Sequence, residues 1–301
     1  MGSQEQLTNF GYCSMSHGRS DYEGFYGLSE GSRFYGFHCH DFYEIYLYIR
    51  GAQYFGVDNS VYRMEPDQLV IIPPFRMHGF LREDSVPDYE RAYLYCSQEF
   101  LSRIGCGLVD LSALLTDQAA GPDCLMYSLS HQKAEECMDL LRQLMNNSDA
   151  HTPYDRFTDL TYILSFFRIV LETMGSVCPR SSVSTGNPGM HDVLVYINEH
   201  FTEPLTLEVL SAQCGVSVST LSHDFMRYTH HSVYNYILYR RIMLAKQKLF
   251  EQLSLSDIAL LCGFGDYSNF LRAFKKIAGL SPKEYRKQIQ LRMDGSESNH
   301  L

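Results

Sequence analysis

The fold is decided by residues 255–286, which read LSDIALLCGFGDYSNFLRAFKKIAGLSPKEYR. The apolar spacing at the start of this stretch predicts a short helix that ends in a turn at residues 262–264, where a glycine can adopt a positive φ. Asp266 is placed to cap a second helix that buries Phe270 and Phe274. A short helix, a glycine turn and a second helix form a helix-turn-helix motif, whose second helix can enter the major groove of DNA.

A similar motif precedes it in the chain. Thr206 is a predicted helix N-cap, Gly215 supplies a turn, and Ser217 caps a following helix over about residues 218–228. The predicted helices of this part of the chain cover about 190–201, 206–213, 217–229, 232–251, 255–262, 266–278 and 281–291. Two tandem motifs therefore predict an all-α domain that binds duplex DNA.

The second motif also contains a specific series of residues. The series is Ile258-Ala259, Cys262-Gly263-Phe264, Asp266-Tyr267-Ser268-Asn269-Phe270, Arg272-Ala273-Phe274-Lys275, Gly279, Ser281-Pro282 and Tyr285-Arg286. With this series, residues 190–290 resemble the AraC/XylS family of transcription regulators. The resemblance implies that a long helix, here about Ser232 to Glu251, joins the two motifs, and that their recognition helices read one asymmetric half-site.

Polar residues near the starts of the two recognition helices are the candidates for base contacts. They are Ser219, Ser222, His223, Ser268 and Arg272. Arg272 can make bidentate hydrogen bonds to guanine, and the alternative is an arginine that faces phosphate or solvent. The AraC/XylS family usually has an arginine where this chain has His223, which is a departure from the family. The candidates for phosphate contacts are Arg240, Lys246, Lys275, Lys276, Lys283 and Arg286.

Charge is unevenly distributed along the chain. The whole chain has a formal net charge of −10, which by itself is unusual for a protein that binds DNA. Residues 221–292, however, contain 12 Lys and Arg against 5 Asp and Glu, a net charge of +7, whereas residues 1–186 contain 13 against 24. The basic segment contains most of the predicted DNA-binding helices, so the distribution favours nucleic-acid binding at this end.

The first half of the chain has a different periodicity. Residues 33–100 alternate apolar and polar residues in short runs with frequent turn signals, which predicts an antiparallel sandwich or barrel. After residue 130 the apolar spacing changes to three and four, and predicts amphipathic helices at about 131–147 and 154–174. Residues 175–188 lack a periodic apolar pattern and are the best predicted linker in the chain.

A histidine motif lies inside the predicted sheet. His38, His40 and Glu44, followed by His78, resemble the motifs of the cupin family, a small β-barrel fold, although Phe75 replaces a glycine of the second cupin motif. In metal-binding cupins the corresponding residues ligate one divalent ion, and three imidazoles with a carboxylate suit Fe, Mn, Ni or Zn. Three interpretations stay open: a metal site, contacts to a polar effector, or hydrogen bonds within the barrel.

Tyrosines surround this motif. Tyr46 and Tyr48 share the face of Glu44 because side chains alternate along a strand. Their rings would give a small-molecule pocket apolar walls with hydroxyl groups, so they are candidate effector contacts.

Together these patterns predict a multidomain α+β protein. Residues 1–125 form a cupin-like ligand-sensing β-barrel, 126–175 a helical dimerisation region, 176–188 a linker, and 189–293 an AraC-type DNA-binding domain. The predicted function is a sequence-specific transcription regulator, an activator by resemblance, that responds to a small-molecule effector such as a sugar. Its expected partners are duplex DNA, a second copy of the chain in a homodimer, and RNA polymerase.

Two other functions are consistent with parts of the sequence. A metal-dependent cupin enzyme with an accessory helical domain would depend on the His38, His40, Glu44 and His78 group alone, and the DNA-binding pattern argues against it. In the other interpretation, the barrel serves only protein contacts. The regulator needs no turnover, so no catalytic residue is assigned and an enzyme is not expected.

The sequence also limits the compartment. The first ten residues lack a basic stretch followed by an apolar one, and no run of about eighteen apolar residues occurs. The nine cysteines are scattered without a C-x-x-C pair, which argues against a disulfide framework or a zinc–thiolate site. We therefore expect a cytoplasmic protein with no membrane segment.

Overall fold

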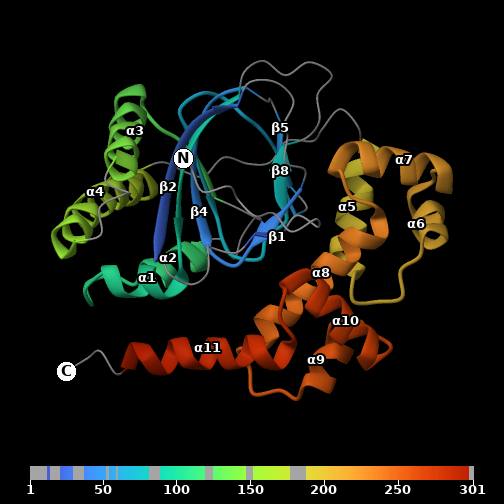
Figure 1. Cartoon of the computed structure of the whole chain (residues 1–301). Helices are drawn as coiled ribbons and strands as arrows, with labels where there is room; N and C mark the ends of the chain where they lie inside the picture. Colours follow the sequence, from blue (N-terminus) through green and yellow to red (C-terminus); the bar gives the residue numbers. More distant parts are fainter. Residues whose placement is uncertain are drawn as a thin grey trace. The chain divides into compact units, whose positions relative to one another are not determined.

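The described residues of the computed structural model form two compact units. The N-terminal unit holds those between 13 and 176, and the C-terminal unit holds Tyr12 and those between 188 and 297. The described ranges are 12–13, 21–29, 37–51, 54–58, 60–80, 89–118, 125–146, 152–176 and 188–297. Strands with helices build the N-terminal unit, and the C-terminal unit is helical (Figure 1).

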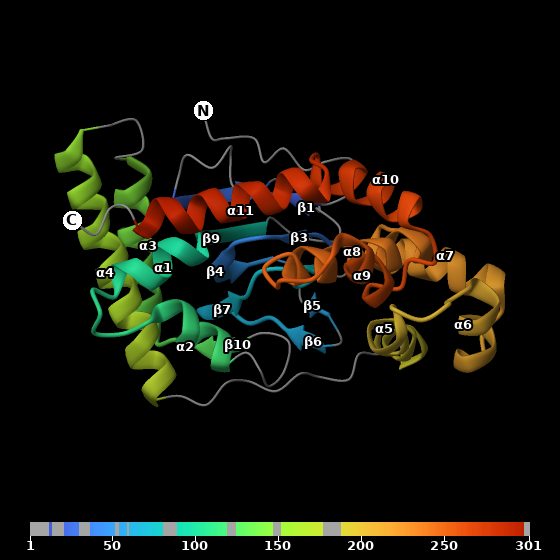
Figure 2. The same cartoon turned by 90° about the horizontal axis from the view of Figure 1, so that it is seen from below.

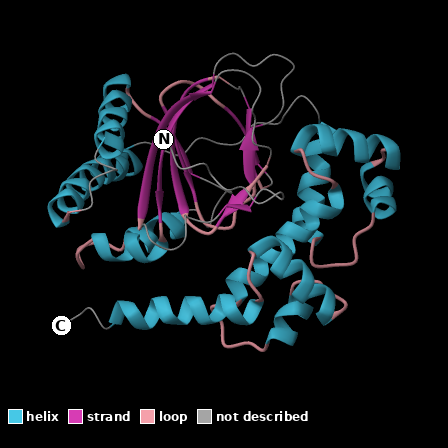
Figure 3. Ribbon diagram, in the orientation of Figure 1, coloured by secondary structure: helices cyan, strands magenta, loops and turns pink. Residues whose placement is uncertain are grey.

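Two facing sheets form most of the N-terminal unit. The strands of the described residues are β1 (Tyr12–Cys13), β2 (Tyr22–Ser29), β3 (Cys39–His40), β4 (Tyr43–Arg50), β5 (Tyr54–Val57), β6 (Ser60–Arg63), β7 (Gln68–Ile72), β8 (His78–Phe80), β9 (Tyr89–Cys96) and β10 (Leu125–Ser128). One antiparallel sheet has the order β10-β7-β4-β9-β2 and another has the order β6-β5-β8. Figure 3 shows the two sheets facing each other. The predicted antiparallel β domain is confirmed.

Strand β4 lies in the middle of the larger sheet and has two different faces. Tyr43, Ile45 and Leu47 point into a hydrophobic core that four helices share. These helices are α1 (Gln98–Ile104), α2 (Leu111–Gln118), α3 (His131–Asn146) and α4 (Pro153–Ser176). Glu44 and Tyr46 lie on the opposite face, toward β8 and β5. Figure 2 shows β9, β4 and β7 side by side, so this face is continuous with its neighbours.

The C-terminal unit contains the two predicted helix-turn-helix motifs. Its helices are α5 (Pro188–His200), α6 (Leu207–Cys214), α7 (Val218–Thr229), α8 (Val233–Lys248), α9 (Leu255–Leu261), α10 (Tyr267–Ala278) and α11 (Pro282–Glu297). Thr206, Ser217 and Asp266 accept backbone N–H bonds at the starts of α6, α7 and α10, and Gly215 has a φ of 67°, as predicted. No helix in the described ranges is long and apolar enough to cross a membrane.

Two helix ends differ from the prediction. The connecting helix α8 ends at Lys248 rather than near Glu251, because the chain tightens there: Phe250 N–H bonds to Gln247 O at 3.2 Å and Glu251 N–H to Lys248 O at 3.1 Å. These bonds span three residues and not the four of an α-helix. Helix α11 continues to Glu297, beyond the predicted end at residue 291.

Candidate functional site

The second helix of each motif presents polar side chains to solvent. Ser219, Ser222 and His223 are exposed on α7, and Ser268 and Arg272 are exposed on α10. The residues that anchor the opposite faces in the core are Leu221, Phe225, Phe270 and Phe274. All five predicted base-contact residues thus lie where a DNA groove can reach them, and their contacts with bases stay a prediction.

The two recognition helices differ in what they present. On α10, Arg272 Nη2 donates to Asn269 Oδ1, which uses one of the five guanidinium N–H donors. On α7, the side chain of His223 is 76% exposed and its Nδ1 lies 3.1 Å from Asp224 Oδ1. Because a guanidinium fork matches the two acceptors of guanine and an imidazole does not, α10 has the stronger chemistry for base readout.

The predicted phosphate contacts fall into two groups. The lysines among them that reach solvent are Lys275, Lys276 and Lys283. Arg240 and Arg286 are half-buried: the Arg240 guanidinium lies 5.1 Å from the centre of the Phe201 ring, and Arg286 Nη2 donates to Leu253 O at 2.8 Å. Both arginines therefore have a packing role in the free protein, and their phosphate contacts stay a prediction.

Lys246 was predicted to contact phosphate, and this prediction is wrong. The residue has no exposed surface, and its Nζ lies 4.6 Å from the centre of the Tyr285 ring of α11. The buried face of α8 recurs at Tyr239, Ile242 and Met243, and helical spacing continues this face to position 246. This helical spacing could have indicated a buried residue at position 246, but a lysine side chain suggested an exposed one.

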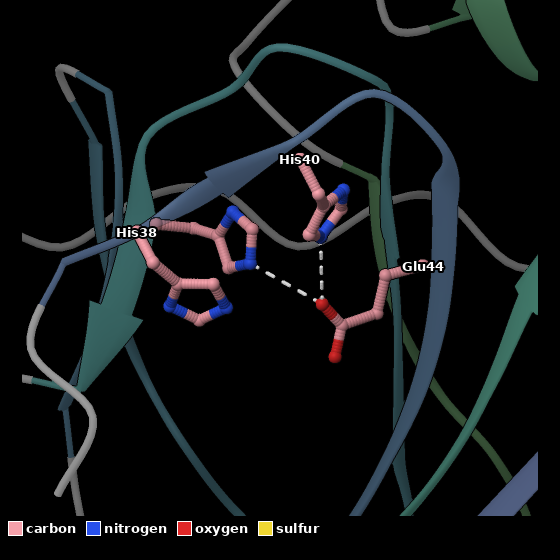
Figure 4. A group of neighbouring side chains, drawn as sticks. His38, His40 and Glu44 are labelled. Carbon is pink, nitrogen blue, oxygen red and sulfur yellow. Dashed lines mark hydrogen bonds and ion pairs between the residues drawn. The ribbon is translucent and has the colours of Figure 1, made fainter. Parts of the chain in front are cut away.

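The histidine motif assembles into one buried cluster in the N-terminal unit. His38 is half-buried, His40, Glu44 and His78 are buried, and their ligand atoms all lie within 4.8 Å of one another. Figure 4 shows the interactions that converge on one Glu44 oxygen. Oε2 lies 3.0 Å from His40 Nε2 and 3.2 Å from His78 Nε2. The four residues come from β3, β4, β8 and the bridge in which residues 38 and 78 pair.

The hydrogen bonds of the imidazoles determine which nitrogen carries a proton. His40 Nδ1 lies 2.9 Å from Phe42 O, and His78 Nδ1 lies 2.9 Å from Arg76 O. A carbonyl oxygen only accepts, so each Nδ1 is the donor, and in a neutral ring Nε2 carries a lone pair. Both lone pairs then point at a carboxylate oxygen. A proton on Nε2, a proton on the carboxyl group or a bound metal ion would each satisfy this arrangement.

Burial disfavours a proton on Nε2 of His40, because the ring would then be charged. Desolvation lowers the pKa of His40 despite the hydrogen bond with Glu44, which favours the neutral ring. Burial also opposes ionisation of Glu44, but contacts with His40 and His78 hold the pKa of Glu44 below its usual value. The cluster thus offers a carboxylate that favours its ionised form and a His40 ring that favours its neutral form. The Nε2 atoms of His40 and His78 lie close to one Glu44 oxygen, so these residues could together hold a small cation.

Aromatic side chains line the same face beyond the cluster. Tyr46 and Tyr48 are buried, and the Tyr46 hydroxyl hydrogen-bonds with that of Tyr89. Burial raises the pKa of Tyr46, so its hydroxyl stays protonated. Arg91, which was not among the residues predicted from the sequence, pairs with Tyr48 across β4 and β9, and its guanidinium lies 4.7 Å from the centre of the Tyr89 ring. The alternation within β9 was visible in the sequence, but its register against β4 was not.

Family models match both units of the chain. A family model described as an AraC-like ligand-binding domain matches residues 23–164, and one described as a helix-turn-helix domain matches residues 210–288. The first match contains the histidine cluster, and the second contains both recognition helices.

Curated relatives agree with these matches. The chain is 23% identical to the uncharacterised HTH-type transcriptional regulator YdiP of Escherichia coli over 85% of this chain and 82% of the relative. It is 23% identical to the HTH-type transcriptional activator RhaS of Yersinia pseudotuberculosis, over 84% and 89%. The regulatory protein SoxS of Escherichia coli is 30% identical over 101 residues, which are 33% of this chain and 94% of SoxS.

The exposed guanidinium of α10 generates a testable difference between two substitutions. Arg272→Ala should remove a preference for one base pair at a cost of about 1–3 kcal/mol, because a bidentate contact is lost. Lys276→Ala should weaken binding to all sequences alike, since phosphates carry no sequence information. Selection of sites from randomised duplex DNA by each purified variant measures both effects. An unchanged selected sequence with Arg272→Ala would place Arg272 on phosphate.

Proposed function

This chain belongs to the AraC family of DNA-binding transcription regulators, and we propose that it is an activator controlled by a small molecule bound in its N-terminal unit. The observation that carries the proposal is the pairing of two exposed recognition helices with a β domain whose inner face is polar and aromatic. The relative RhaS, named as a transcriptional activator, supports activation. The protein acts in the cytoplasm, where its DNA is.

The effector contacts the inner face of the larger sheet. Tyr46, Tyr48, Tyr89 and Arg91 offer rings for stacking and hydroxyl or guanidinium groups for hydrogen bonds. A polyhydroxylated ligand such as a sugar matches this combination of apolar faces and polar groups. The effector changes DNA binding by as much as it favours one arrangement of the two units over another.

Transcription in vitro tests activation. The assay uses purified RNA polymerase and a template with the DNA upstream of the protein's own gene, and the full-length protein should raise the transcript level. An effector is first identified by thermal shift with a panel of sugars and metabolites, and its addition should change that level. A regulator that lowers transcription under all effector conditions would overturn activation. The variant Arg272→Ala separates loss of DNA binding from loss of polymerase contact.

A divalent transition metal such as Fe, Mn, Ni or Zn fits the histidine cluster. His38, His40, Glu44 and His78 would hold it through imidazole nitrogens and one carboxylate, the donor set that such ions prefer. The metal would supply a positive charge that orients an oxygen of the effector. The backbone carbonyls of residues 42 and 76 fix the His40 and His78 rings for this role.

Elemental analysis tests the metal. Full-length protein supplied with Fe, Mn, Ni and Zn should retain about one ion per chain, and a chelator should lower its melting temperature, because an ion that binds only the folded state stabilises that state. His40→Ala should abolish retention, while His131→Ala, which changes an exposed histidine outside the cluster, should not. Absence of metal with an unchanged melting curve, combined with lost induction by His40→Ala in a reporter strain, would favour direct effector contact instead.

The chain forms a homodimer through α4. Along one side of this helix, Tyr154, Phe157 and Leu164 are 83%, 69% and 45% exposed. Their spacing of three and seven residues places them on one face, which suits packing against the same face of a second copy. The neighbouring Phe166 and Phe167 face the core of their own unit and are not available for this contact.

Charge on this face should separate the protomers. Phe157→Glu and Leu164→Glu should each shift the protein from dimer to monomer at micromolar concentration, because a carboxylate would be buried without a partner. Light scattering measures the mass. Leu108→Glu is the matched control, since Leu108 is 92% exposed and lies outside α4. A monomeric wild type, with or without DNA, would overturn this assignment.

A further inference from the structure

The turn glycines of the two motifs have different surroundings. Gly215 has a φ of 67° and Gly263 a φ of 81°, so both occupy the left-handed region that favours glycine. Among the described residues, nothing would lie within 4 Å of a Cβ on Gly215, whereas a Cβ on Gly263 would lie 2.3 Å from Thr202 O. The positive φ is the reason for a glycine at position 215. At position 263 a glycine is also required because the loop that follows α5 lies too close for a Cβ.

Arg241 of α8 holds the same loop. Its Nε donates to Phe201 O at 2.6 Å, and its Nη2 donates to Glu203 O at 2.7 Å. Because the guanidinium is planar and rigid, two bonds to carbonyls on either side of residue 202 fix the position of the loop. The Arg241 Cζ also lies 5.9 Å from the centre of the Phe264 ring, next to the second turn glycine.

These contacts reach both recognition helices. Phe264 packs against Phe270, a buried residue of α10, with ring centres 5.3 Å apart. On the other side, α5 packs against α6 and α7, which form the first motif. The loop at residues 201–203 and Arg241 therefore provide a second path of contacts between the motifs, besides the connecting helix α8.

We propose that Arg241 and Gly263 are positioning residues: they lock the loop at residues 201–203 against the second motif, fix the orientation of α7 relative to α10, and thereby set the spacing of the two DNA subsites. The proposal rests on the proposed function in one respect, because both motifs must read DNA. Helix α8 alone would be a single connection between the motifs. The contacts of Arg241 and Gly263 with the loop at residues 201–203 add a second connection, which resists rotation of one motif relative to the other.

The geometry of DNA makes such a lock consequential. One added base pair moves a subsite by about 3.4 Å along the duplex and turns it by about 35° around the axis. A rigid pair of motifs fits one spacing and loses the binding of one motif at any other. A pair free to rotate accepts neighbouring spacings with a smaller loss, since the second binding event depends on the geometry of the link.

Site selection with spacer variants tests the proposal. The full-length protein is used to select duplexes from a randomised library, and the expected motif has two sequence blocks with one spacing. Insertion of one base pair between the blocks should weaken wild-type binding by about tenfold or more, but binding of Arg241→Gln and Gly263→Ala by only about threefold or less. The base preference within each block should not change, because no recognition residue is altered.

Matched variants separate positioning from general damage. Gly215→Ala imposes a similar positive φ on alanine without a close neighbour, and Lys248→Gln removes from α8 a charge that is paired with Glu251. Both should keep the wild-type spacing dependence. Melting curves show whether each variant is folded, and Arg241→Lys, which keeps the charge but loses the planar fork, replaces Arg241→Gln if the latter is unfolded.

Three results would overturn the proposal. The first is a folded Arg241→Gln or Arg241→Lys variant with the wild-type loss on insertion. The second is a changed base preference in one block, which would indicate damage within a single motif. The third is a wild-type protein that selects only one block, which would also remove the two-motif reading of DNA on which the proposal rests. Failure to select any sequence would instead contradict the proposed function.

Discussion

The antiparallel register of β4 with β7 and β9 is the constraint on which the N-terminal unit depends. Side chains alternate along a strand, so a shift by one residue would send Glu44 into the hydrophobic core under the helices and Ile45 to the inner face. A carboxylate buried there would lose its histidine contacts, which costs several kcal/mol. The same register that protects the core therefore also places Glu44 opposite His78.

Local signals made the C-terminal unit predictable. The caps at Thr206, Ser217 and Asp266 and the turn at Gly215 each depend on residues within a few positions, and the structure has all four as expected. The histidine cluster was predictable for another reason. His38, His40 and Glu44 lie close together in the sequence and only His78 is distant, and their spacing matched a known motif that already encodes the three-dimensional arrangement.

Features that depend on distant contacts were not predictable. Lys246 is buried because α11 covers that face of α8, and residue type alone suggests the opposite. Arg91 lies beside Tyr48 only through the pairing of β4 with β9. Arg241 bonds to carbonyls about forty residues earlier in the chain, and backbone acceptors have no sequence signature. In each case the sequence shows the group but not its partner.

The contacts that connect the two motifs matter because the recognition helices α7 and α10 present different side chains to DNA. Helix α10 presents Arg272, Lys275 and Lys276, whereas the corresponding positions of α7 carry His223, Met226 and Arg227. With the weaker base-reading side chain on α7, the proposed composite site depends on the second motif to hold the first in the correct geometry. An effector changes DNA binding only by as much as it favours one arrangement of the protein over another. The contacts of Arg241 and Gly263 with the loop at residues 201–203 are the feature of this unit that would hold two unequal motifs at one spacing.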